Sequence, residues 1–136
     1  MIDKIKAMVW EFSEDAIVKN RSIPNDMNDI AIETTAASLI EHIHEEAVIG
    51  YGRSLLNLFR VNEYPVLNPS VERISNRVAV DLAKRLDIDN SSAYGVVTRI
   101  IPHIANRIRN KLQNPEDHEF DLNQLMHTFS DRGWQY

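Results

Sequence analysis

Hydrophobic side chains recur every three or four residues along most of the chain, which is the spacing of an α-helix with one buried side. The pattern predicts one helix before Pro24 and a second soon after it. It predicts a third helix from Asn68-Pro69, a fourth after the polar cluster at 87–90 and a short last one after Asp121. A short helix or turn over 54–59 would add one more. We therefore expect an all-α fold, a compact bundle of five or six helices.

The second predicted helix has the clearest amphipathic pattern. Its apolar residues fall within about 100° of arc; they are Ile32, Ala36, Leu39, Ile40, Ile43 and Ala47. The glutamates fall outside that arc, so segment 41–46 is expected to form a solvated polar face. The stripe of the third helix is Val71, Ile74, Val78, Leu82 and Leu86. In the fourth helix Pro102 is expected to cause a kink without ending the helix, because its ring removes one hydrogen bond.

The 136 residues and 43% hydrophobic content are typical of one domain with one core. Within a single domain over 1–136 we expect N-terminal helices in 1–60, a loop at 61–69, a helix-turn-helix-like pair with a short C-terminal helix in 70–130, and a tail at 131–136. No apolar run approaches the roughly 18 residues that span a bilayer, and the start lacks the pattern of a signal peptide, so the cytoplasm is the expected location. The absence of cysteine excludes disulfides, thiolate metal sites and cysteine nucleophiles.

The charge is unevenly distributed. The net charge of −5 argues against a protein that coats nucleic acid unspecifically, since such binding depends on Lys and Arg neutralising phosphates. Residues 71–112, however, contain eight basic and four acidic side chains, and they are flanked by acidic segments on both sides. Two interpretations follow: the packed helices complement one another in charge, or the basic segment docks an acidic partner.

Three parts of the chain resemble the YidB-like family of bacterial proteins of unknown function. They are residues 19–32, which place Ile23-Pro24-Asn25 before a helix, the third and fourth predicted helices, and residues 114–122, which run from Asn114-Pro115 to Phe120-Asp121-Leu122. The resemblance spans most of the chain and implies a helical fold related to homeodomain-like arrangements. It implies no catalytic residues. The chain departs from the family at 59–65, where relatives often have a glycine-rich linker.

Residues 80–99 look like a helix-turn-helix, with apolar residues where the two helices would meet. In a DNA-binding protein of that kind the second helix would enter the major groove. The side chains available for contact would then be Asn90, Ser91, Ser92, Tyr94 and Arg99. Asp87 stands where the tight turn usually has glycine, which weakens the match. Two helices joined by a short turn also occur in any helical bundle, so plain packing is the alternative.

Basic residues form a ridge along the side of the fourth helix, at intervals of four: Arg99, His103, Arg107 and Lys111. Like charges at this spacing repel one another, so the ridge is expected to lie beside carboxylates. These belong either to the chain itself, in the second helix or the acidic C-terminal segment, or to an acidic partner protein or nucleic acid.

Segment 41–46 contains groups that bind metals, but His42 and His44 lie about 200° apart on a helix and cannot share an ion. Only His42 and Glu46 have a suitable spacing, and two ligands are too few. We therefore expect no metal site and no cofactor. The segment 50–54 matches neither a nucleophile elbow nor a phosphate-binding loop, so no catalytic residues are expected.

Together these patterns predict a non-enzymatic interaction module that binds a protein partner or itself, with the basic ridge as the electrostatic anchor. Tyr64, Val66 and Leu67 on the loop are candidate apolar contacts or core residues. The alternative is a DNA-binding protein that uses segment 80–99.

Overall fold

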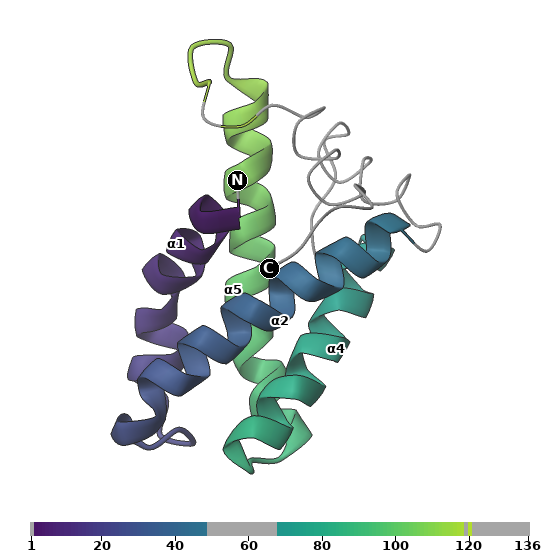
Figure 1. The fold of residues 1–136 in the computed structure, drawn as a ribbon. Coiled ribbons are helices and arrows are strands. Elements are labelled where there is room, and N and C mark those ends of the chain that lie inside the picture. The colour runs from purple at the N-terminus through teal and green to yellow at the C-terminus, as the bar shows by residue number, and fades with distance from the viewer. Residues whose placement is uncertain (1, 49–67, 119, 121–136) are drawn as a thin grey trace.

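The computed structural model describes residues 2–48, 68–118 and 120, and most of these residues form helices (Figure 1). Four α-helices are present in this part of the chain: α1 (Ile2–Ser13), α2 (Asn28–Val48), α4 (Pro69–Leu86) and α5 (Asn90–Gln113). The prediction of an all-α fold is confirmed. The predicted count of five or six helices is not reached, and the expected helices at 54–59 and after Asp121 lie outside the described residues, as does the loop carrying Tyr64, Val66 and Leu67.

The connection from α1 to α2 contains two irregular helical turns. A π-helical turn, Glu14–Val18, follows α1 directly, and a 3-10 turn, Asn25–Met27, precedes α2. At the start of the π-turn the hydroxyl of Ser13 donates to the Val9 carbonyl, which competes with the regular backbone ladder. The predicted break at Pro24 is confirmed, since its backbone is extended with ψ of 144°. Helix α2 starts four residues after Pro24, at Asn28, because the 3-10 turn intervenes.

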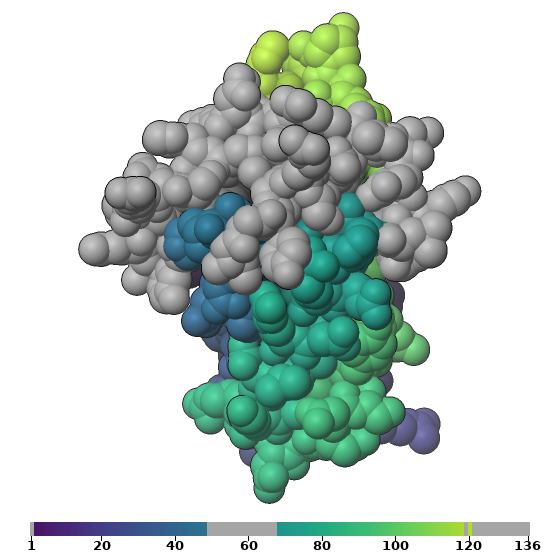
Figure 2. Space-filling view, turned by 90° about the vertical axis from the view of Figure 1, so that its right-hand side faces the viewer, coloured from purple at the N-terminus to yellow at the C-terminus, as the bar shows by residue number. Residues whose placement is uncertain are grey.

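The four helices pack around one core. Helix α4 packs against α2 and α5, and α1 packs against the same two helices (Figure 1). Figure 2 shows the α4 face, with the C-terminal part of α2 on one side of α4 and the start of α5 below it. None of the described helices is long and apolar enough to span a membrane.

The predicted stripes supply most of this core. In α2 and α4 the buried residues include Ile32, Ala36, Leu39, Ile40, Val71, Ile74, Val78 and Leu82. Helix α5 buries Ala93, Val97, Ile100, Ile101, Ile104 and Ile108, and it continues through Pro102 as predicted. The spacing of hydrophobic residues alone predicted these buried positions, because one side of each helix faces the interior.

Helix α4 begins with the predicted cap. The side-chain oxygen of Asn68 accepts hydrogen bonds from the backbone N–H groups of Ser70, at 2.8 Å, and Val71, at 3.3 Å, and Pro69 follows in the first turn. Two N–H groups that lack partners within the helix are satisfied in this way.

Replacing Asn68 by alanine is expected to lower the free energy of unfolding by about 1 kcal/mol, because both acceptor interactions are lost. Urea unfolding followed by circular dichroism measures the effect. Asn68→Ser is the control, since a hydroxyl also caps, and it is expected to retain most of the stability. Equal losses in the two variants would show that the cap is not what Asn68 contributes.

Candidate functional site

A groove of about 450 Å³ lies where the end of α1 meets the start of α2. It is lined by Trp10, Ser13, Glu14, Val18, Asn25, Asp26, Asn28, Asp29 and Ile32. Trp10 and Val18 are 45% and 42% exposed, although large apolar side chains are usually covered in a folded domain. Trp10 lies on α1, and Val18 is the last residue of the π-turn that follows it. The groove therefore combines accessible apolar surface with a polar rim.

The rim of this groove is acidic. Its ionisable residues are the carboxylates Glu14, Asp26 and Asp29, and none forms an ion pair with any residue that the structure describes. Asn28 adds a side-chain oxygen that is buried and accepts no hydrogen bond from the described part of the chain. Local electrostatics at this groove favour a cation over an anion.

The basic ridge is partly neutralised within the chain. Arg107 pairs with Glu11 of α1 at 3.0 Å, and its guanidinium lies 4.9 Å from the centre of the Phe12 ring. The His103 ring stacks on the same Phe12 ring, with 5.6 Å between the two ring centres. Lys111 pairs with Asp117 at 3.4 Å. Two of the four ridge residues therefore have carboxylate partners in this chain, one on α1 and one in the acidic C-terminal segment.

Arg99 remains exposed at the end of the ridge. It borders a shallow pocket that is also lined by His103 and by three carboxylates, Glu11, Glu14 and Asp15. The fields of these carboxylates oppose that of the cation, so the ridge offers an acidic partner little unbalanced positive charge.

Helices α4 and α5 are joined by a short turn over residues 87–89. Asp87 adopts a left-handed conformation with φ of 54°, the position at which glycine was expected. Asp89 caps α5 by accepting from the Ser92 N–H at 3.4 Å, and the hydrogen bonds from Ser92, its side chain first and its backbone after it, lower the pKa of Asp89. Helix α5 thus starts at Asn90, slightly earlier than expected.

Four of the proposed DNA-contacting residues lie within the first five residues of α5, and Arg99 lies further along the same helix. Asn90, Ser91, Tyr94 and Arg99 are exposed and Ser92 is half-buried. Asp87 and Asp89 are also exposed beside them. Their negative charges would repel phosphates at the position where a reading helix meets the DNA backbone.

A cluster of polar side chains joins α2 to α4. His42 donates through Nε2 to Asp81 Oδ2 at 2.8 Å and through Nδ1 to Glu45 Oε2 at 2.9 Å. Ser38 donates to the same Asp81 oxygen at 2.6 Å. A neutral imidazole has one N–H only, so donation to two carboxylates requires the imidazolium form.

The pKa values agree with this assignment. Burial opposes the charge on His42, but the hydrogen bonds to Glu45 and Asp81 outweigh it and raise the pKa of His42. Burial also opposes ionisation of Asp81, and the hydrogen bonds from Ser38 and His42 reverse that effect and lower the pKa of Asp81. The cluster thus holds a positive ring between two carboxylates.

The expectation of a solvated face at 41–46 is wrong for two of its residues. Glu46 is fully buried and His42 is 9% exposed, because α4 packs against this side of α2. Arg73 binds both carboxylate oxygens of Glu46, with contacts of 2.8 to 3.2 Å, and Arg77 approaches at 3.5 Å. Glu46 is therefore held by arginines and shares no ligand face with His42.

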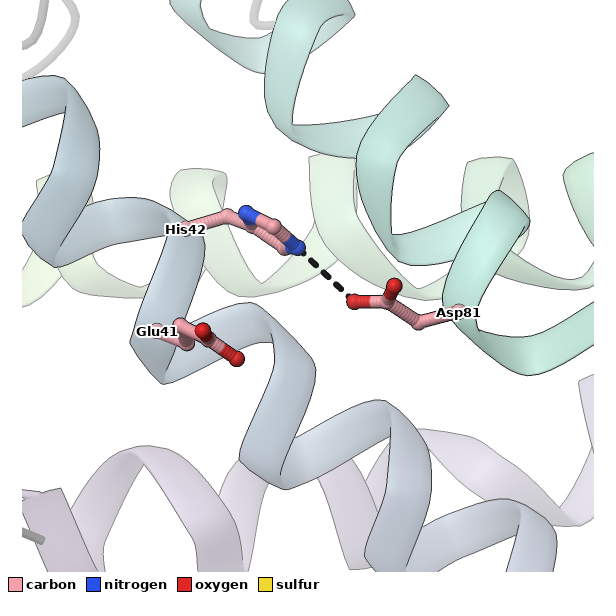
Figure 3. A group of neighbouring side chains, drawn as sticks. All are labelled: Glu41, His42 and Asp81. Carbon is pink, nitrogen blue, oxygen red and sulfur yellow. Dashed lines mark hydrogen bonds and ion pairs between the residues drawn. The ribbon is translucent and has the colours of Figure 1, made fainter. Parts of the chain in front are cut away.

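Glu41 belongs to a different group of side chains, together with His42 and Asp81. One ligand atom each from Glu41, His42 and Asp81 lie within 4.8 Å of one another. In Figure 3 the His42 ring points at the Asp81 carboxylate across the space between α2 and α4, and Glu41 extends from α2 one residue before His42.

Asp81, Arg73 and Arg77 were not among the residues singled out from the sequence. A signal existed: these three recur every four residues along α4, as Ser38, His42 and Glu46 do along α2. Two polar series of the same period, one on each helix, indicate facing surfaces.

No family model, curated protein or solved structure matches the chain.

Proposed function

We propose that the protein is a non-enzymatic interaction module whose groove between α1 and α2 binds a basic, apolar segment of a partner protein. The observation that carries the proposal is the exposure of Trp10 and Val18 in one groove with three carboxylates. Tryptophan is enriched among the residues that dominate binding energy, because it offers a large contact area at low entropic cost. The carboxylates would select Lys or Arg beside the apolar anchor.

This proposal moves the anchor away from the basic ridge. Arg107 and Lys111 already have carboxylate partners within the chain, so an acidic partner would have to displace them. No described residue forms an ion pair with the three carboxylates of the groove, so a basic partner would have none to displace.

Selection from a random peptide library displayed on phage tests the proposal. Peptides retained by the wild type are expected to combine a large apolar residue with Lys or Arg, and Trp10→Ala should lose most of them. Tyr94→Ala is the matched control, since Tyr94 is 40% exposed and does not line the groove. Retention of the same peptides by Trp10→Ala, or enrichment of acidic peptides that depend on Arg99, would contradict the groove as the binding site.

Charge reversal then tests specificity. Asp29→Lys is expected to weaken binding of the selected basic peptides at least tenfold in a fluorescence titration, because it places like charges in contact. A peptide in which Lys is replaced by Glu should show the opposite preference. Equal binding of both peptides to both proteins would mean that the rim does not select charge.

The second candidate function is DNA binding through segment 80–99. In that case the helices would have a homeodomain-like arrangement, and the protein would belong to the YidB-like family. The left-handed residue in the α4–α5 turn and the exposed Asn90 and Ser91 favour it. Asp87 and Asp89 count against it. Fluorescence anisotropy with duplex DNA at several salt concentrations separates the two, since DNA binding would weaken steeply with salt.

A further inference from the structure

A second candidate site is the cluster of polar side chains between α2 and α4, which lies apart from the groove. Three side chains with ligand atoms for metals converge there from two helices: Glu41 and His42 from α2 and Asp81 from α4. Neutral imidazole and carboxylate are established zinc ligands. Two adjacent residues of one helix and one residue of a facing helix can surround an ion, which a single helix with His42 and Glu46 cannot do.

We propose that Glu41, His42 and Asp81 bind a divalent zinc ion, in the place now taken by the proton between His42 Nε2 and Asp81. Ligands at Zn–N and Zn–O distances of about 2.0 to 2.1 Å lie about 3.3 Å apart in a tetrahedral site. The His42 Nε2 to Asp81 Oδ2 distance of 2.8 Å must therefore open by about half an ångström. Binding releases the Nε2 proton to solvent, and the Nδ1 proton stays on His42.

The residues around the three ligands already hold them in place. Glu45 accepts the Nδ1–H of His42, which fixes the tautomer and aims Nε2 at the site. This carboxylate–histidine arrangement is the usual support for a metal-binding imidazole. Ser38 orients the Asp81 carboxylate by its hydrogen bond. The geometry thus supplies both the ligands and the groups that orient them.

Charge and access also fit a divalent ion. The carboxylates of Glu41 and Asp81 balance the two positive charges, and Glu45 has a separate cation at 3.6 Å in Arg77. The Asp81 side chain is 40% exposed, so an ion from solvent reaches the site without opening the core. A nitrogen ligand selects zinc over magnesium, which prefers oxygen ligands.

Calorimetric titration of the full chain with zinc chloride tests the proposal. The wild type is expected to bind one equivalent, and Asp81→Asn and His42→Gln should each weaken binding at least about tenfold. His44→Ala is the matched control, because it removes a histidine two residues away on the same helix that is not part of the group. Glu45→Ala is expected to weaken binding by about 10–100-fold, since it removes the group that orients the imidazole.

Circular dichroism establishes which variants are folded, and thermal unfolding provides an independent readout. Zinc should raise the melting temperature of the wild type and of His44→Ala but not of Asp81→Asn, and magnesium chloride should not replace it. If the wild type binds no zinc, or if folded Asp81→Asn binds it as tightly as the wild type, the proposal fails. Loss of zinc binding in His44→Ala alone would also overturn it. None of these measurements involves the α1–α2 groove.

Discussion

Replacing Arg73 by methionine is expected to lower the free energy of unfolding by about 3 kcal/mol. The substitution keeps the aliphatic part of the side chain but removes the guanidinium that binds both oxygens of Glu46. Glu46 is fully buried, so among the described residues its charge would be left with the 3.5 Å contact to Arg77. Removing one partner of a buried ion pair typically costs 3 to 5 kcal/mol, and the remaining arginine places the value near the lower end. Urea unfolding measures it.

A double-mutant cycle separates the lost partner from lost packing. The combined variant Glu46→Leu with Arg73→Met removes both charges, and it is expected to recover most of the stability because no buried charge remains. Arg85→Met is the matched control on the same helix; Arg85 is exposed, so its loss should change stability by less than about 0.5 kcal/mol. If the double variant is as unstable as Arg73→Met, the cost arises from packing and not from the unpaired carboxylate.

Replacing Val78 by alanine is expected to cost about 2 kcal/mol. Val78 is fully buried on α4, the helix that packs against both α2 and α5. Two methyl groups leave the core, each worth about 0.8 kcal/mol of transfer free energy, and the cavity left behind adds to the loss. The gain in helix propensity offsets part of it. Thermal and urea unfolding should give the same order of variants.

Val80→Ala is the matched control for this prediction. The same substitution is made two residues along the same helix, where the side chain is 40% exposed. Little apolar burial is lost, and alanine favours the helix by a few tenths of a kcal/mol, so the variant is expected to be as stable as the wild type or slightly more so. Similar losses at 78 and 80 would contradict the assignment of the buried side of α4.

Local spacing was enough to predict the helices and most of the core. The stripe through Val71, Ile74, Val78 and Leu82 predicted the buried side of α4, because the period of the helix fixes which residues share a side. The cap at Asn68 and the break at Pro24 were predictable for a similar reason, since each depends on a residue and its immediate neighbours.

The interactions between helices were not predictable from spacing alone. Glu46 falls outside the apolar arc of α2, and its burial depends on arginines that follow it by 27 and 31 residues in the sequence. The exposure of Trp10 depends on the route of the chain through the π-turn and the 3-10 turn. The partner of Arg107 lies 96 residues away on α1. Such pairings are set by tertiary packing.

The order of ion pairs between α2 and α4 has a consequence for how the two helices align. From one end to the other, Ser38 and His42 meet Asp81, Glu45 meets Arg77, and Glu46 meets Arg73. If α4 slid by one turn so that position 77 took the place of position 81, the His42 cation would face an arginine and Asp81 would leave its partners. Hydrophobic stripes alone tolerate such a shift, because the residues along them are similar. The charged contacts therefore make the observed alignment of the helices the favoured one.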